Sequence, residues 1–365
     1  MSNKKEVLFP PVVMAHITDD LSKVYKNKLD RKDSAVIHFS SQPNGIPHLG
    51  TITTLGTAFA LGKLLEDKIG ISTKVKVATL ENAPIEKVLG ENGIEYARLI
   101  CNIPSEIPNL TLSQYYMQFY HEILNKFKDH SGIDYEVYSY NEFQSNSYVR
   151  SRLIEMIKRE EKFGPILSPN EGILKFRFNC PDCGYQDKSS QTVKLIRNNS
   201  DSELVFSSSC LNHEDYELMV TPENNTFIDM NTTLRSVIRK SQYIKEAKEN
   251  NALNLMVDGG DWSHLVPLLS DALIMLGHSY FDLPQRVSAP IIEDWSGAKF
   301  SKFLYVEKES YDEVPEGLIN YEHFISNYGD NGFSKLWKEI ESWPQNPKKL
   351  FRNYSIEYFA NLLEK

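Results

Sequence analysis

The feature that constrains the fold most is a strand, a turn-rich loop and a helix in immediate succession around residue 40. Residues 35–40 are apolar enough for a buried strand, and residues 42–50 are rich in turn formers. Apolar residues then recur at helical spacing over 51–67. A second, alternating strand pattern follows at 73–80. This order predicts a parallel α/β unit over roughly the first 100 residues.

The rest of the chain divides into segments that differ in hydrophobic periodicity. Long helical patterns fill residues 111–163, interrupted by a short strand pattern at 133–138. Residues 172–220 change to short alternating strands, and helical and α/β texture returns after 230. Aromatic and charged residues after position 302 recur at roughly helical spacing. We therefore expect an α/β protein with a small β-rich insert.

Composition narrows the class of protein. The 365-residue chain is 41% hydrophobic and 24% charged, which is ordinary for a globular protein. Its net charge of −9 opposes sequence-independent attraction to phosphate backbones. The first residues hold only a short apolar stretch, broken by Pro10 and Pro11, so we expect neither a signal peptide nor a membrane span. The predicted location is cytoplasmic, without a membrane partner.

The loop at 43–51 lies between the first strand and its helix, where open α/β sheets bind ligands. Gly45 and Gly50 allow the backbone to approach a ligand closely. The helix N-terminus favours an anion, and His48 can donate a hydrogen bond to a phosphate. The alternative is a surface turn with an incidental histidine. We interpret the loop as a phosphate-binding site.

Two further stretches carry candidate chemistry. Residues 296–302 contain Lys299 and Lys302, whose ammonium groups suit a developing pyrophosphate charge, although a solvated basic loop would look the same. Residues 256–262 combine a strand pattern with Gly259 and Asp261, either a ribose-binding strand end or a simple turn.

Cysteine spacing predicts a metal site. Cys180 and Cys183 form a C-x2-C knuckle, and Cys210 and His213 form a C-x2-H knuckle, a combination typical of tetrahedral zinc. Four protein ligands leave no open position for water, so the expected role is structural. The alternative is a set of reduced cysteines with a chance histidine. Cys101 stands alone and is expected to be a buried apolar residue.

Together these motifs resemble class I aminoacyl-tRNA synthetases. Residues 48–51 resemble the HIGH signature, residues 296–302 the KMSKS loop with Lys299 and Lys302 in its lysine positions, and Gly259 to Asp261 the strand-end Gly-x-Asp of that class. Within the class, residues 43–51, 132–138 and 262–277 are most similar to class I lysyl-tRNA synthetase. The resemblance covers roughly residues 30–310.

The resemblance implies a Rossmann-like, parallel-sheet catalytic domain of the HUP type with a zinc-ribbon insert and a short helical C-terminal tail. It implies ATP, Mg²⁺ and Zn²⁺ as cofactors. It divides the chain into the first half of a nucleotide-binding domain with a helical connective region (1–170), a zinc-binding β-rich insert (171–225), a second catalytic half (226–305) and a helical C-terminal region (306–365).

The resemblance also assigns roles to single residues. Catalytic roles fall on His48, Thr51, Lys299 and Lys302. ATP-binding roles fall on Pro43, Asn44, Gly45, His48, Gly50, Thr51, Gly259, Asp261, Lys299, Ser301 and Lys302. We expect Ser40, Ser41 and His264 to line an amino-acid pocket.

The implied activity is ATP-dependent activation of lysine or a similar amino acid to an aminoacyl-adenylate. The segment after residue 302 has room for a few helices but not for a large anticodon-reading domain, so we expect transfer to a non-standard acceptor, a small molecule or a carrier. Two alternatives stay open. The enzyme could charge a tRNA or modified tRNA through the acceptor arm alone, or the chain could be a non-catalytic nucleotide-binding regulator.

Overall fold

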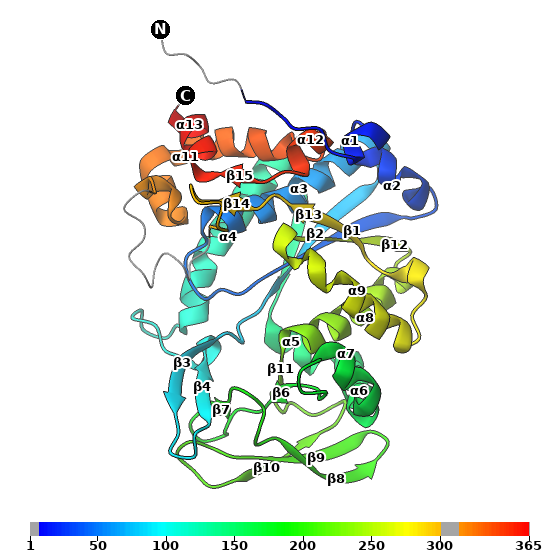
Figure 1. Cartoon of the computed structure of the whole chain (residues 1–365), viewed down its shortest axis with the longest axis vertical. Coiled ribbons are helices and arrows are strands. Elements are labelled where there is room, and N and C mark those ends of the chain that lie inside the picture. Colours follow the sequence, from blue (N-terminus) through cyan, green and yellow to red (C-terminus); the bar gives the residue numbers. More distant parts are fainter. Residues whose placement is uncertain (1–6, 301–313, 365) are drawn as a thin grey trace.

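A five-stranded parallel sheet forms the centre of the computed structural model, which describes residues 7–300 and 314–364. The strand order is β13-β12-β1-β2-β5, and every neighbouring pair is parallel (Figure 1). The predicted α/β class is therefore confirmed. The strands are β1 Ser34–Ser41, β2 Ser72–Thr79, β5 Asp134–Tyr138, β12 Ala252–Gly259 and β13 Gln285–Ala289.

One face of the sheet is covered by an apolar layer of helices. Alternate residues of β1 (Ala35, Ile37 and Phe39) point into this layer and are almost fully buried. Gly56 of α3 lets Phe127 of α4 approach closely, since a Cβ there would lie 2.7 Å from the Phe127 ring. The helices of this layer are α3 Leu49–Ile69, α4 Leu112–Ser131 and α11 Tyr321–Glu341.

The opposite face of the sheet is more polar. His38 of β1 donates a 3.0 Å hydrogen bond from Nε2 to the side-chain oxygen of Asn254 in β12, and its ring stacks on Tyr243 of α8 (Thr232–Glu249) at 3.5 Å. Burial lowers the pKa of His38 to about 3, so this imidazole is neutral. Beyond α8, an apolar cluster unites further helices: α6 Ser147–Lys158, α7 Glu160–Leu167 and α9 Val266–Met275.

The end of the molecule far from the sheet is β-rich (Figure 1). It contains an antiparallel hairpin that pairs with a short strand beside the cysteines. This hairpin corrects the expectation that the first 100 residues form one parallel unit, because its residues leave the central sheet and join another. The strands are β3 Pro84–Leu89, β4 Glu95–Leu99, β6 Phe176–Arg177, β7 Tyr185–Asp187, β8 Lys194–Ser200, β9 Glu203–Ser208, β10 Tyr216–Val220 and β11 Asp229–Met230.

The helical patterns expected near the C-terminus coincide with α11 and α13, which pack against the apolar layer. The four-part division of the chain stays a prediction. No described helix combines the length and the apolar character needed to cross a membrane. The other elements are α1 Met14–Ile17, α2 Ser22–Leu29, α5 Tyr140–Ser145, α12 Pro347–Leu350, α13 Ile356–Glu364, β14 Ile292–Glu293, β15 Tyr354–Ser355, and short 3₁₀ turns at Ile100–Asn102, Gly260–Leu265, Tyr280–Asp282 and Glu316–Leu318.

Candidate functional site

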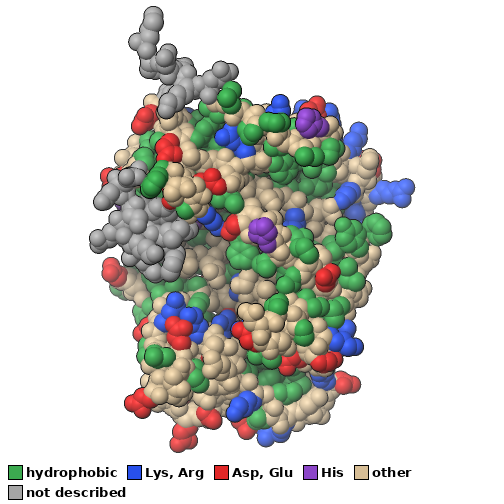
Figure 2. All heavy atoms as spheres, viewed as in Figure 1, with side chains coloured by type: hydrophobic (Ala, Val, Ile, Leu, Met, Phe, Trp, Pro, Cys, Tyr) green, Lys and Arg blue, Asp and Glu red, His purple; other side chains and the backbone are tan. Residues whose placement is uncertain are grey.

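A cleft of about 410 Å³ opens at the carboxyl ends of β1 and β12, between the N-terminal ends of α3 and α8. Charged side chains of both signs are scattered over the face of the molecule seen in Figure 2. Pro43 and His264 are not among the lining residues of the cleft, and Ser301 and Lys302 lie outside the described residues. The predicted residues that do line it are Ser40, Ser41, Asn44, Gly45, His48, Gly50, Thr51, Gly259, Asp261 and Lys299.

His48 is the N-cap residue of α3. Its Nδ1 accepts a 3.1 Å hydrogen bond from the Gly50 amide, so in the neutral ring Nε2 carries the proton, 3.2 Å from the Thr51 hydroxyl. A Cβ at residue 50 would lie only 3.0 Å from the imidazole ring. Gly50 therefore allows the ring to lie across the positive end of α3, where an anion is favoured.

Lys299 reaches the cleft from a tight turn. Asp294 accepts hydrogen bonds from the amides of Ser296 and Ala298, and Gly297 has a left-handed φ of 82°. Phe300, only 1% exposed, anchors the end of the turn in the core and contacts the His48 ring edge-on at 5.8 Å. The turn thus holds Lys299 on the same side of the cleft as His48.

Lys299 and Asp261, two predicted ATP-binding residues, form an ion pair. The Lys299 ammonium lies 2.5 Å from an Asp261 carboxylate oxygen, although Asp261 is in the 3₁₀ turn after β12 and Lys299 is in the turn after β14. Both side chains are partly exposed, so the pair contributes little to folding stability. A competing anion such as a phosphate can therefore recruit Lys299 at small cost.

The far wall of the cleft is formed by α8 and was missed by sequence reasoning. Arg235, Arg239 and Lys240 line the cleft and are 5%, 4% and 6% exposed. Burial, together with nearby Arg286 and Arg239, lowers the pKa of Lys240 to about 7. The only available signal was three cations at i, i+4 and i+5 of an amphipathic helix, a pattern that usually marks a solvated surface.

Two of the three residues predicted to bind the amino acid line the cleft, Ser40 beside α8 and Ser41 beside Tyr120 of α4. Ser40 Oγ accepts a 3.1 Å hydrogen bond from Arg239, and Ser41 Oγ lies 2.9 Å from the Tyr120 hydroxyl. His264 is instead exposed on the 3₁₀ turn after β12. Its assignment to the amino-acid pocket has no geometric support.

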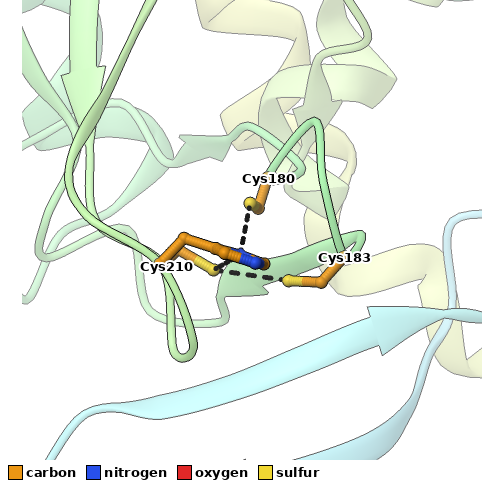
Figure 3. Close-up of side chains that lie close together, drawn as sticks. Cys180, Cys183 and Cys210 are labelled. Atoms are coloured by element: carbon orange, nitrogen blue, oxygen red, sulfur yellow. Dashed lines mark hydrogen bonds between the residues drawn. The ribbon is translucent and has the colours of Figure 1, made fainter.

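A separate cluster lies in the β-rich end of the molecule. The sulfur atoms of Cys180, Cys183 and Cys210 and an imidazole nitrogen of His213 all lie within 4.8 Å of one another (Figure 3). The Cys183 and Cys210 sulfur atoms are 3.3 Å apart, and His213 Nδ1 is 3.5 Å from Cys180 Sγ and 3.4 Å from Cys210 Sγ. The structure thus brings the four predicted metal ligands together.

The geometry of these residues fits a tetrahedral zinc ion. Ligand atoms about 2.1–2.3 Å from a common centre lie roughly 3.5–3.8 Å from one another, close to the spacings here. Gly184 supplies the left-handed φ of 76° that closes the first knuckle, and its amide donates to the Cys180 carbonyl. The Asn212 amide donates to Cys210 Sγ, which orients that sulfur. The donor set of three thiols and an imidazole suits Zn²⁺.

Cys101 lies outside this cluster. It is half-buried rather than fully buried, and burial raises the pKa of its thiol to about 12. The thiol is therefore protonated and unreactive at neutral pH. This agrees in part with the expected apolar role.

Comparison with solved structures finds distant similarity. A protein assigned as an arginyl-tRNA synthetase from Campylobacter jejuni is 10% identical over 93% of this chain and 71% of its own, with a TM-score of 0.43. A glutamate-tRNA synthetase from Elizabethkingia anophelis is 9% identical over 89% and 70%, with a TM-score of 0.41. No protein-family model matches the sequence, and neither does any curated protein. This chain is therefore characterised by its own geometry: a parallel α/β sheet with a cleft at its carboxyl edge and a distant Cys₃His cluster.

Proposed function

We propose that the protein activates an amino acid with ATP and forms an aminoacyl-adenylate. The observation that carries the proposal is the placement of His48 at the start of α3 beside the Lys299–Asp261 pair in one cleft. This is where a parallel α/β sheet binds a nucleotide, at the carboxyl ends of its strands. The synthetase-like motifs of the sequence support the same chemistry.

In the proposed reaction, a carboxylate oxygen of the amino acid attacks the α-phosphorus of ATP. A new P–O bond forms, the bond from the α-phosphorus to the bridging oxygen breaks, and pyrophosphate leaves. His48 donates from Nε2 to the phosphate oxygens, whose charge changes most in the transition state. Lys299 leaves Asp261 and holds the departing pyrophosphate.

ATP arrives with Mg²⁺, which offsets part of the phosphate charge. The residues of the cleft orient the bound ATP and donate hydrogen bonds to its phosphates. Gly259 and Asp261, at the end of β12, lie where the ribose of a bound nucleotide would meet the sheet. Zn²⁺ belongs to the separate Cys₃His cluster and has a structural role in this proposal.

The acyl acceptor in our proposal is a small molecule or a carrier. The net charge of −9 disfavours the many phosphate contacts that would hold a tRNA. Transfer assays with amines, carriers and total tRNA test this part separately from activation. Efficient charging of tRNA would replace this acceptor with the acceptor-arm alternative.

The test of activation is ATP–pyrophosphate exchange with each amino acid in the absence of tRNA. We expect exchange with a small set of related amino acids and none in their absence. If ATP binds but no amino acid supports exchange, the activation proposal is wrong and the non-catalytic alternative replaces it.

A further inference from the structure

Three cations of α8 face the cleft and form no ion pair with an acidic side chain of residues 7–300 or 314–364. Arg235, Arg239 and Lys240 are each more than nine-tenths buried, and all three line the cleft. Cations on one buried helix face repel one another, because the interior screens charge less than water does. A helix with a purely structural role would carry apolar residues at these positions.

The two carboxylates that line the cleft are already engaged. Asp258 of β12 pairs with Arg286 of β13, and Asp261 pairs with Lys299. Each carboxylate therefore forms its direct ion pair with a cation that does not belong to α8, while Asp258 also favours the charged forms of Arg239 and Lys240 from a greater distance. The described lining residues offer no third carboxylate to the α8 cations.

A carboxylate behind the lining, that of Asp229, is also committed. Asp229 is fully buried and pairs with Arg177 at 2.9 Å. It accepts further hydrogen bonds from the amide groups of Asn82 and Gln186. Asp229 therefore belongs to a separate network beside Arg235. The α8 cluster keeps an excess of positive charge.

Some hydrogen-bond donors of the cluster also have no acceptor among the described residues. Arg239 donates once, from Nη2 to Ser40, while its Nε and Nη1 have no acceptor within the described residues. Over the same ranges, no carboxylate or hydrogen-bond acceptor pairs with the Lys240 ammonium. The two buried Arg239 donors cost free energy unless a ligand accepts from them.

The backbone adds to the same positive field. α8 begins at Thr232, which lines the cleft, so the positive end of an 18-residue helix faces the cluster. Arg235 lies in the first turn of α8, where a cation is unfavourable unless an anion is near. Side chains and helix end thus point to one requirement, a bound anion.

We propose that Arg235, Arg239 and Lys240 bind an anionic side chain of the amino acid, so that the substrate is acidic rather than lysine-like. The inference rests on the proposed activation of an amino acid and names its chemical class. The carboxylate to be activated faces His48, while the second anion, a carboxylate or a phosphate, faces α8 and Ser40.

The charge of the cleft distinguishes this substrate from the alternatives. A lysine side chain would add a fourth cation to a buried cluster, and the described lining offers it no carboxylate that is not already paired. The phosphates of ATP have their own cationic partners in the positive end of α3 and in Lys299. An acidic side chain is the group that would balance the α8 wall.

The first test is ATP–pyrophosphate exchange with aspartate, glutamate and phosphoserine, each compared with asparagine, glutamine or serine, and with lysine and arginine. We expect at least one acidic substrate to exceed its neutral counterpart by about a hundredfold in kcat/KM, as removal of a buried charge pair implies. The carboxylate and phosphate arms separate the two sources of anion. Preference for lysine, arginine or a neutral amino acid would overturn the inference.

Variants of α8 provide the second test. Arg239→Gln and Lys240→Met should raise KM for the acidic substrate by about tenfold or more, with KM for ATP nearly unchanged. Lys245→Met is the matched control, because Lys245 is on the same helix but is exposed and pairs with Glu249. An equal effect of all three variants, or an effect on ATP alone, contradicts the assignment.

Direct binding separates this inference from the activation proposal. Calorimetry on the wild-type protein with the same amino acids requires no reaction. Binding of an acidic amino acid that is lost in Arg239→Gln supports the anion site even if exchange is absent. If no acidic amino acid binds more tightly than its neutral counterpart, the anion site is wrong, whatever the exchange assay shows.

Discussion

The two walls of the cleft are built differently. The α3 wall uses a helix end and a neutral ring, with His48 fixed by hydrogen bonds to Gly50 and Thr51. The α8 wall uses long cationic side chains, Arg239 and Lys240, which form no ion pair with an acidic side chain in the described parts of the chain. The first wall is complete without a ligand, whereas the second requires one.

The two walls therefore contribute differently to catalysis and to substrate binding. A preorganised, neutral donor stabilises charge that develops during the reaction, so its loss lowers kcat. A charged pocket binds its ligand in the ground state, so its loss raises KM. The predictions below test this division between catalysis and binding.

The largest expected effect belongs to the α3 wall. His48→Ala should lower the rate of adenylate formation by about a hundredfold or more, the usual loss for one preorganised donor. ATP affinity should change little. Pre-steady-state measurement of adenylate formation checks this, with His264→Ala as the control because His264 is exposed outside the cleft lining. A His48→Ala variant that changes only KM would contradict the catalytic role assigned to the α3 wall.

Zinc removal affects a region that belongs to neither wall. The protein should carry about one Zn²⁺ per chain, and Cys180→Ser/Cys183→Ser should lose it. Because metal binding stabilises only the folded form, the strands around the cluster should loosen first. Metal analysis and amide exchange over β7 to β10, with β1 as the internal reference, measure both effects. Metal-free native protein, or simultaneous loosening of β1, would contradict this prediction.

The α8 wall should respond to pH. The pKa of Lys240 is lowered to about 7, chiefly by burial and next by Arg286 and Arg239, with Asp258 opposing the shift. Above pH 7 the free protein loses this charge, so KM for an acidic substrate should rise by up to about tenfold by pH 8. Arginine stays charged, so Lys240→Arg should flatten the profile. If KM rises by the same amount in Lys240→Arg, a group other than Lys240 causes the pH dependence.

The smallest expected effect concerns stability. The pKa of Lys240 is lower in the folded protein than its ordinary 10.5, so the unfolded chain binds more protons between about pH 7 and 10.5. Stability should therefore rise with pH over this window. Lys240→Met should remove this slope and, near pH 7, raise Tm by a few degrees, because it removes a buried charge. Thermal unfolding without ligand measures both, and a lower Tm for Lys240→Met would make the α8 wall structural.

Much of the fold could be predicted from local patterns. The β1 strand, the loop before α3 and α3 itself lie within one stretch of sequence, and their hydrophobic periods differ clearly. The Cys₃His ligands could also be predicted, because each knuckle places two ligands within one turn. In both cases the residues that act together are neighbours in the chain.

Other features gave no such signal. The β3–β4 hairpin was missed because the strand that completes its sheet, β7, lies far along the chain. The cations of α8 were missed because helical spacing predicts which residues share a face but not whether that face meets solvent or a cleft. His264 was assigned by proximity to Asp261 in sequence, although the 3₁₀ turn exposes its side chain.

By itself, therefore, the sequence determined the α/β class, the loop that caps α3 and the knuckles of the metal cluster. These depend on backbone conformation and on ligand spacing within a few residues. The tertiary structure decided that Lys299 meets Asp261, that β3 and β4 join β7, and that α8 turns its cations inward. The physical reason is that burial, which sets the energetic cost of a charge, depends on packing between distant segments.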